Sequence, residues 1–421
     1  MLARRLPPVL HVTPFAATVA SIAGAVQRPE APEARTGGTV DRRTLLTRGA
    51  LGFLGLSLSG CASSPSSVGV LRPHRRLAPV RASWDRVIRT TVGLRPYRPS
   101  GFVLRADRLD DKLLVHNYGH GGSGMSLSWG TGRMAADLAL ARSERLAAVV
   151  GCGVVGLTTA RQLQRRGFDV TIYAATVPPE TTSNMSLASW TPTSGLVDDE
   201  RRTPAWDRQF RTAARSAYVE LQLLVGRGYG VSWLDGYTLH DNPPGGGAPG
   251  DGERAPLLPA ELRTGSRTIG PGEHPFPTRY ATLRPSLRIE PSIYLDRLVS
   301  DVRAAGGRIV IRRFRARRDL AALEEPIVVN CTGLGARDLF GDHELTPLKG
   351  QLTMLMPQDE VDYSTFGSAL PSAGGFVHMS PRRDGVALGG TSVEGDWSME
   401  PDEEARRRIV EAHVDLFARM R

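Results

Sequence analysis

A glycine-rich turn inside a strand–turn–helix–strand pattern constrains the fold of this chain more than any other feature. The turn has the sequence GCGVVG at residues 151–156, and the apolar run at 146–150 before it predicts a buried strand. The residues that follow predict a helix that ends at Gly167, and residues 170–173 predict a second strand. Glycines at this spacing permit a tight turn and let the backbone approach a pyrophosphate at the helix N-terminus. The pattern therefore predicts a Rossmann-like unit that binds a dinucleotide.

Two features of this unit depart from the common pattern. An acidic residue that binds the ribose is expected about 20 residues after the turn, but Ala174 and Ala175 stand there. The turn also lies late in the chain, and a second glycine-rich block, HNYGHGGSGMSLSWG at residues 116–130, precedes it. An assignment of fold and function has to account for both departures.

The composition is that of a soluble globular protein, with 41% hydrophobic and 23% charged residues among 421. This length can hold one large domain or two medium domains. No apolar run reaches the roughly 18 residues that a spanning helix needs, so we expect none in the mature protein. The net charge is +10, and the one dense arginine cluster, at 312–318, favours a solvated surface over nucleic-acid binding. Attraction to anionic lipid headgroups is the alternative for this charge.

The placement of cysteine and histidine argues against metal sites and disulfides. Cys152 lies within the glycine-rich turn and Cys331 ends a strand-like run, and neither belongs to a CxxC pair. Both are interpreted as small buried residues. His116 and His120 are four residues apart, but the glycines beside His120 disfavour a metal-binding helix. We therefore expect no metal site.

The N-terminal region has the pattern of an export signal. It contains twin arginines at 42–43, a modest apolar stretch at 49–58, and the sequence LSGC, which resembles a bacterial lipobox ending at Cys61. Residues 1–61 are therefore predicted to form a Tat-type lipoprotein signal, with an ordinary short apolar helix as the alternative. Residues 62–83 are rich in Ser, Pro and Arg and predict a flexible tether. We expect an exported protein anchored to the outer face of the bacterial cytoplasmic membrane.

Predicted helices and strands interleave along the rest of the chain, which favours an α/β fold. Strands are predicted at 84–93, 102–104, 112–115, 308–314 and 327–329, and helices at 125–142, 204–225, 292–305 and 402–420. The expected fold class is α/β, with a Rossmann-like dinucleotide domain and a smaller α+β domain that has a mixed or antiparallel sheet.

Six motifs between residues 84 and 420 together resemble the D-amino-acid oxidase family of FAD-dependent oxidoreductases. They are GLRPYRPSG, HNYGHGGSGMSLSWG, VVGCGVVGL with its second strand IYA, PPETTSNMSLASWTP, VVNCTG, and KGQ followed by SPRRDGVALGGT. This family has alanine where other flavoproteins carry the ribose-binding acid, which accounts for Ala174. The resemblance implies that the cofactor is FAD. It also implies an FAD-binding domain at 84–195, mainly substrate domain at 196–313, a return to the FAD domain at 314–345, and substrate domain at 346–421.

The resemblance also implies the cofactor contacts. The FAD phosphates would be bound by Gly151, Cys152, Gly153, Val154, Val155, Thr181, Thr182 and Ser183. The flavin would lie along Leu187, Ala188 and Ser189, and its isoalloxazine would meet Gly121, Gly122, Ser123, Gly124, Met125 and Ser126. Phe314 and Thr332 fall where the family contacts the adenosine and flavin parts, with Phe314 expected to contact through its backbone.

Three residues are assigned to the substrate. The resemblance implies that the first arginine of GLRPYRP, Arg95, binds the substrate carboxylate, for which its planar fork is suited. It implies that the carbonyl of Gly122 accepts a hydrogen bond from the substrate amine. His378 stands where the family has an active-site tyrosine, so a substrate contact and a structural role both stay open.

The function implied is oxidation of a small D-amino acid, or a related amine acid, to a 2-oxo acid and ammonia. Hydride transfer to flavin N5 needs positioning more than a side-chain base, so histidine at 378 is compatible with activity. Oxygen would be the electron acceptor, which yields peroxide. One alternative is a membrane-tethered dehydrogenase that uses another acceptor, and a second is a flavin-binding protein without catalysis.

The order of the motifs indicates a circular permutation. In the family, the dinucleotide turn opens the chain, and GLRPxRP and HNYGHGG close it, whereas here the closing motifs come first. The new ends, near Trp84 and Arg421, are therefore expected to be adjacent, and the old ends to be joined through residues 141–145. This order accounts for the late position of the glycine-rich turn.

Overall fold

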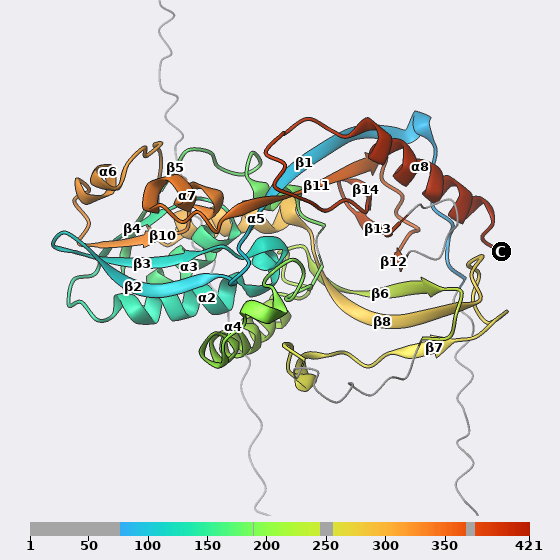
Figure 1. Ribbon diagram of the computed structural model, residues 1–421, viewed down its shortest axis with the longest axis horizontal. Helices are drawn as coiled ribbons and strands as arrows, with labels where there is room; N and C mark the ends of the chain where they lie inside the picture. Colours follow the sequence, from blue (N-terminus) through green and yellow to red (C-terminus); the bar gives the residue numbers. More distant parts are fainter. Residues whose placement is uncertain (1–75, 188, 245–255, 368–374) are drawn as a thin grey trace, which may run out of the picture. The chain divides into compact units, whose positions relative to one another are not determined.

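The structure is a computed structural model that describes residues 76–187, 189–244, 256–367 and 375–421. Within these residues the chain forms two β-sheets with helices packed against them (Figure 1). The predicted signal region with Cys61, the predicted tether up to residue 75, and Ala188 lie outside the described residues. Of the described helices, none is long and apolar enough to cross a membrane.

The first sheet carries the glycine-rich turn. Its order is β2-β3-β10-β4-β5-β9; β2 is antiparallel to β3, and the other neighbours are parallel. The strands are β2 (Val103–Leu109), β3 (Lys112–Tyr118), β4 (Leu146–Val150), β5 (Asp169–Ala174), β9 (Arg308–Ile311) and β10 (Ile327–Asn330). The turn follows β4, and β5 pairs directly with β4, as the sequence pattern predicts.

Helices cover both faces of the first sheet. They are α2 (Gly124–Ala139), α3 (Val154–Gln164), α4 (Pro204–Leu223), α5 (Pro291–Ala304), α6 (Arg317–Ala321) and α7 (Ala336–Phe340). One face packs on α2, α3 and α5, with α4 against α2 (Figure 1). The other face packs on the short helices α6 and α7.

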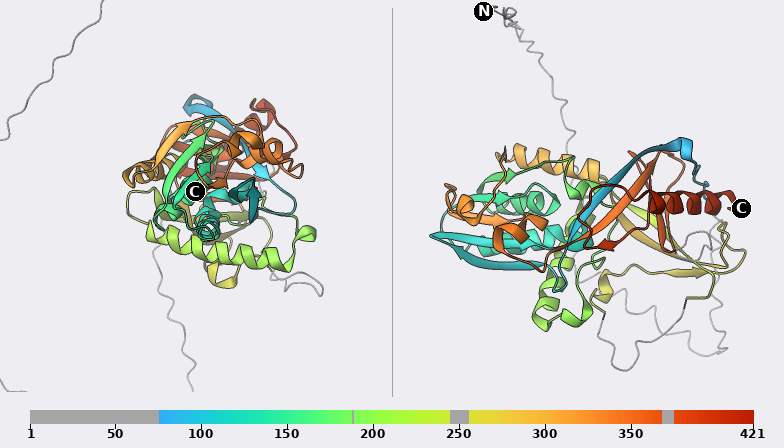
Figure 2. Two further views of the ribbon diagram at one scale, coloured as in Figure 1. Left: turned by 90° about the vertical axis from the view of Figure 1, so that its left-hand side faces the viewer. Right: turned by 45° about the horizontal axis from the view of Figure 1, so that its top comes forward.

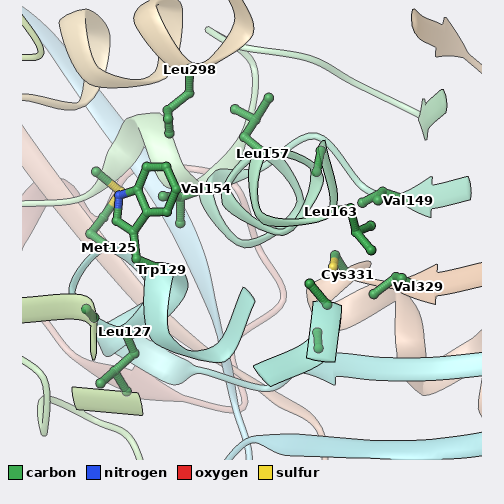
Figure 3. Packing of buried hydrophobic residues seen from close by; sticks show 14 of the residues in the cluster. Met125, Leu127, Trp129, Val149, Val154, Leu157, Leu163, Leu298, Val329 and Cys331 are labelled. Carbon is green, nitrogen blue, oxygen red and sulfur yellow. The ribbon is translucent and has the colours of Figure 1, made fainter. Parts of the chain in front are cut away.

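The strand residues of the first sheet alternate between these two faces. Ala147 and Val149 of β4 belong to the large apolar core, whereas Ala148 and Val150 belong to the smaller cluster that contains Leu320 of α6. Figure 3 shows the large core, where Trp129 of α2, Leu157 of α3 and Leu298 of α5 gather beside the sheet. Because both faces are covered, the central strand β4 has a continuous apolar sequence, LAAVV.

The second sheet is mostly antiparallel and has nine strands among the described residues. Its order is β1-β11-β14-β13-β12-β6-β8-β7, and β15 also pairs with β11. The strands are β1 (Val87–Tyr97), β6 (Val231–His240), β7 (Arg267–Ile269), β8 (Tyr280–Ile289), β11 (Thr346–Leu355), β12 (Tyr363–Gly367), β13 (Val377–Arg382), β14 (Gly385–Gly389) and β15 (Val393–Glu394). Because β12 pairs with β6 in parallel, the sheet is mixed. The two sheets confirm the expected α/β class.

The C-terminal helix α8 (Glu403–Ala418) packs against the second sheet. Figures 1 and 2 both show α8 beside the beginning of β1. The guanidinium carbon of Arg406 lies 5.5 Å from the centre of the Trp84 ring. One apolar cluster lies between α8 and the second sheet. It contains Leu77 and Val80 from the first described residues and Phe417 near the end of the chain.

Three of the expected segment assignments differ from the structure. β1 was assigned to the FAD-binding segment 84–195, but it is the edge strand of the second sheet, because it pairs along its length with β11. α4, α5 and β9 fall in the segment expected to be mainly substrate domain, yet they pack on or extend the first sheet. Residues 77–83 were assigned to the tether, but Leu77 and Val80 are buried and Tyr363 donates a hydrogen bond to the carbonyl of Ala78.

Candidate functional site

A cavity of about 1020 Å³ reaches from the glycine-rich turn to the second sheet. Pockets for drug-sized ligands occupy roughly 300–1,000 Å³, so this cavity can hold a large ligand together with a small one. One end is lined by residues 151–155 after β4, and the other by β11 and β13. The described part of the chain contains no cluster of metal-ligating side chains.

The turn after β4 depends on backbone groups that touch without intervening side chains. Gly151 has a φ of +117°, and a Cβ there would overlap the carbonyl oxygen of Cys331. A Cβ at Gly156 would overlap the carbonyl oxygen of Gly151 in the same way. This packing places the N-terminus of α3 on the cavity, where its N–H groups and positive dipole suit a pyrophosphate.

The residues predicted to hold the phosphates come together at this end. Gly151, Cys152, Gly153, Val154, Val155, Thr181, Thr182 and Ser183 all line the cavity. The hydroxyl of Ser183 accepts a hydrogen bond from the Val154 N–H at 3.0 Å, which joins the 181–183 turn to the helix start. Burial raises the pKa of the Cys152 thiol to about 12, so this cysteine stays neutral at this end of the cavity.

The end of β5 lacks an acid but is bordered by arginines. Ala174 and Ala175 line the cavity together with Phe314, whose ring packs 5.9 Å from that of Tyr173. Arg312, Arg313 and Arg315 also line it. From the sequence, this cluster was interpreted as a solvated surface, with attraction to anionic lipid headgroups as the alternative for the positive charge. Because β9 pairs with β5, the residues that follow β9 reach the phosphate end, and that pairing is not visible in the sequence.

The second glycine-rich block lies at the other end of the cavity. Gly121 and Gly122 precede α2, and Cβ atoms at these positions would meet the carbonyl oxygens of Gly195 and Ser194. The 191–195 segment therefore passes directly against the turn, and the Gly122 N–H donates to the Gly195 carbonyl at 3.2 Å. Predicted flavin contacts that line the cavity here are Gly121, Gly122, Gly124, Met125, Leu187, Ser189 and Thr332.

Two of the residues predicted to contact the flavin do not line the cavity. Ser123 and Ser126 are buried and are not among the cavity-lining residues. The Ser123 hydroxyl donates to the carbonyls of Thr191 and Ser194 at 3.1 Å, and the Ser126 hydroxyl accepts from the Thr191 N–H at 2.8 Å. Their hydroxyls hold the 191–194 segment against α2, a role that their position in a glycine-rich block does not signal.

Arg95 lies in the cavity without a negative partner. Its Nε donates to the carbonyl of Leu348, and its Nη2 lies within hydrogen-bond distance of the carbonyls of Lys349 and Thr391 and of the Ser392 hydroxyl. No carboxylate within the described ranges forms an ion pair with it, and Nη1 has no acceptor there. Burial lowers the pKa of Arg95, although an arginine stays charged at neutral pH. A fixed, half-buried and uncompensated guanidinium is suited to bind a carboxylate.

His378 lies on β13, directly opposite Gly389 of β14. Its ring packs between Phe366 and Phe376, with centroid distances of 6.3 and 5.9 Å, and all three side chains line the cavity. A Cβ at Gly389 would overlap the His378 ring, so the absence of a side chain there makes room for the imidazole. The histidine is therefore part of the cavity wall.

His378 contributes no positive charge to the site at neutral pH. Burial lowers its pKa to about 3, and electrostatic repulsion from His413 and Arg95 adds to this effect. Its Nδ1 is buried and has no hydrogen-bond partner in the described structure. Arg95 is therefore the charged group at this end of the cavity, and the neutral imidazole can offer a hydrogen bond beside it.

Comparison with known proteins places the chain among flavoproteins. The family model "FAD dependent oxidoreductase" matches residues 65–138 and 147–420. D-amino-acid oxidase from Rubrobacter xylanophilus is 30% identical over 280 residues, which is 65% of this chain and 78% of that protein. D-amino-acid oxidase from Streptomyces coelicolor is 33% identical over 267 residues, 62% and 74% of the two chains. Human D-aspartate oxidase is 29% identical over 269 residues, 62% and 73%.

Solved structures with a similar fold include glycine oxidase from Bacillus cereus. Its TM-score is 0.45 at 14% identity, covering 65% of this chain and 78% of that one. The L-alpha-glycerophosphate oxidase of Mycoplasma pneumoniae, solved with FAD bound, has a TM-score of 0.45 at 16% identity, covering 66% and 80%.

The backbone contact at Gly156 generates a prediction about FAD. In Gly156→Ala, the new Cβ should push residue 156 away from the Gly151 carbonyl, at a cost in folding free energy of about 3 kcal/mol or more. We expect this change to release the cofactor. The FAD retained per chain, measured by absorbance after purification, checks this. Gly265→Ala is the control, because a Cβ at Gly265 meets nothing within 4 Å. Full FAD occupancy in Gly156→Ala would contradict the assignment of this turn to the pyrophosphate.

Proposed function

We propose that this chain, which belongs to the family of FAD-dependent oxidoreductases, oxidises the CH–NH2 group of a D-amino acid. Its cofactor is FAD. The product would be an imino acid that water hydrolyses to a 2-oxo acid and ammonia, while two electrons and two protons reduce O2 to peroxide. The observation that carries the proposal is the uncompensated Arg95 guanidinium, in one cavity with the two glycine-rich turns.

The chain's own residues would orient the substrate. Arg95 would bind the carboxylate through its unpaired Nη1, and the carbonyl of Gly122 would accept from the amine. When bound, FAD would supply the acceptor for the hydride that leaves the substrate Cα. The N-terminus of α2 points its dipole to this end of the cavity and favours the negative charge that develops there. Positioning is then the main contribution of the protein, because no side-chain base is required.

The cavity wall supports a substrate with a single negative charge. Asp338 is the only carboxylate among the lining residues that the structure describes, and Arg95 and the neutral His378 stand at the substrate end. A substrate carboxylate therefore meets one cation, and a substrate amine meets no acid that would compete with the Gly122 carbonyl. His378 would contact the substrate as a neutral hydrogen-bonding group.

A peroxide assay tests the activity. The purified FAD-loaded protein is incubated with a panel of D- and L-amino acids, with oxygen alone and with an added artificial electron acceptor. We expect peroxide with D-amino acids. Turnover only with the artificial acceptor would indicate a dehydrogenase, and no turnover under either condition would indicate a flavin-binding protein without catalysis.

Arg95→Ala tests the carboxylate site. The variant should lose about 2–5 kcal/mol of substrate binding, because a charged substrate group is left unpaired in a partly desolvated site. KM is the measurement, and FAD content should stay unchanged because Arg95 lies at the substrate end. Arg105→Ala, which removes an exposed arginine on β2, is the matched control. An unaltered KM in Arg95→Ala would remove Arg95 from the site.

We also propose that the fold is circularly permuted. The family model matches in two segments that break between residues 138 and 147, where the old ends were expected to be joined. Tyr363 donates to the carbonyl of Ala78 and contacts the sulfur of Met420, so the first and last described segments lie against one side chain. Ends that lie close together on a surface are those at which permutation is tolerated.

A rearranged chain tests the permutation. The chain would begin at Leu146, run to Arg421, continue through a short linker to Leu77, and end at Leu140. We expect it to fold and bind FAD, because the packed contacts of the two sheets are the same in either order. Thermal unfolding and FAD absorbance are the measurements. An unfolded, colourless product would contradict the permutation.

We propose export and lipid anchoring from the N-terminal motifs alone. Twin arginines, an apolar stretch and the LSGC sequence precede Cys61, which would carry the lipid. Expression of Cys61→Ser in a bacterium that exports folded proteins should move the protein from the membrane fraction to the soluble fraction. Retention of Cys61→Ser in the membrane would reject lipidation.

A further inference from the structure

The orientation of Arg95 depends on neutral acceptors rather than on an acid. Its Nη2 reaches the carbonyl of Thr391 and the hydroxyl of Ser392 at 3.2 Å each, and its Nε reaches the carbonyl of Leu348 at 2.9 Å. A carboxylate partner would also fix the guanidinium, but it would neutralise the charge that a substrate carboxylate needs. The position of the Thr391–Ser392 turn therefore controls where the cation points.

This turn fills an interruption in the second sheet. β11 pairs with β14 from Leu352 onward and with β15 at Leu348 and Lys349, so Gly350 and Gln351 have no partner strand on that side. The Thr391 hydroxyl accepts a hydrogen bond from the Gln351 N–H at 2.7 Å, in place of the missing ladder bond. Because the Thr391 hydroxyl accepts the hydrogen bond from the β11 backbone, the Thr391 carbonyl can accept the one from Arg95 Nη2.

The side chain of Gln351 links this part of β11 to the C-terminal helix α8. Its Nε2 donates to the Asp402 carbonyl at 2.9 Å, and its Oε1 accepts from the Asp402 N–H at 2.8 Å. Asp402 is the N-cap of α8, since its Oδ1 accepts from the Ala405 N–H at 3.0 Å. Gln351 is 4% exposed, so both bonds are shielded from water. Strand β11, the turn and α8 are thus joined beneath Arg95.

We propose that Thr391 and Gln351 are positioning residues of the substrate site, which hold Arg95 in a fixed orientation without neutralising it. The inference rests on the proposed role of Arg95 in binding the substrate carboxylate. Neither residue needs to touch the substrate carboxylate for this role. Loss of either side chain would leave the orientation of the Arg95 guanidinium less well defined. Binding of the substrate carboxylate would then be weaker.

The test is Thr391→Val in the FAD-loaded protein, because valine keeps the shape of threonine and removes only the hydroxyl. We expect KM for the best D-amino acid of the panel to rise about tenfold while kcat changes less than about twofold, the pattern of lost uniform binding. The Kd of propionate, a carboxylate that cannot be oxidised at an amine, should rise by the same factor. Flavin absorbance reports this Kd. Thr391→Ser, which restores the hydroxyl, should recover both values.

Two further variants separate positioning from general stability. Gln351→Met removes both hydrogen bonds to Asp402. Like Thr391→Val, it should raise both KM and the propionate Kd. Thr212→Val removes an exposed hydroxyl that bonds to the Arg208 carbonyl within α4, and should leave both values unchanged. If Thr391→Val does not fold, Ser392→Ala decides, because it deletes one exposed acceptor of Arg95 and should raise KM about threefold.

The outcomes distinguish this inference from the proposed function. If Arg95→Ala raises KM and Thr391→Val, Gln351→Met and Ser392→Ala do not, the positioning role is wrong and the carboxylate assignment stands. If Arg95→Ala also leaves KM and the propionate Kd unchanged, the carboxylate site itself is wrong. Recovery in Thr391→Ser together with a selective rise of KM in Thr391→Val supports the positioning role.

Discussion

Direct contact between backbones is the constraint on which the cofactor cavity depends. At one end, Gly151 and Gly156 meet without side chains between them, and Gly151 also meets the carbonyl of Cys331 on the neighbouring strand. At the other end, Gly121 and Gly122 meet the 191–195 segment in the same way. Each contact points the N-terminus of a helix, α3 or α2, into the cavity. Any side chain at these positions would separate the elements that form the two ends of the site.

The charge of the site follows from two helix N-termini and from the arginines that line the cavity. The helix N-termini carry partial positive charge, and the arginines after β9 border the phosphate end. At the substrate end, Arg95 stands without an acid and His378 is neutral, because burial holds its pKa at about 3. Both ends of the cavity are therefore suited to anions. Arg95 keeps its charge available for such an anion because only neutral groups among the described residues hold it.

The sequence predicts the parts of this fold that depend on local order. The turn at 151–156 and its two strands were found because strand, turn and helix are consecutive. The position of β1 was not found, because its partner β11 lies 253 residues away at the Arg95–Leu348 hydrogen bond, and pairing at that separation leaves no local pattern. The arginines after β9 were missed for the same reason. Ser123 and Ser126 lie in the expected motif, but only packing shows that their hydroxyls bind the 191–194 segment.

The groups that hold Arg95 come from segments of the second sheet that lie far apart in the chain. Arg95 comes from its first strand, the acceptors that hold it come from β11 and the turn after β14, and Gln351 ties these to α8 near the end of the chain. All the partners in these bonds lie far from Arg95 in the sequence. The orientation of Arg95 therefore requires that β1 be paired with β11, which lies far away in the chain. The first and last described segments also meet in this sheet, because Tyr363 donates to the Ala78 carbonyl and contacts the Met420 sulfur, so the neighbourhood of Arg95 is built from both ends of the described chain.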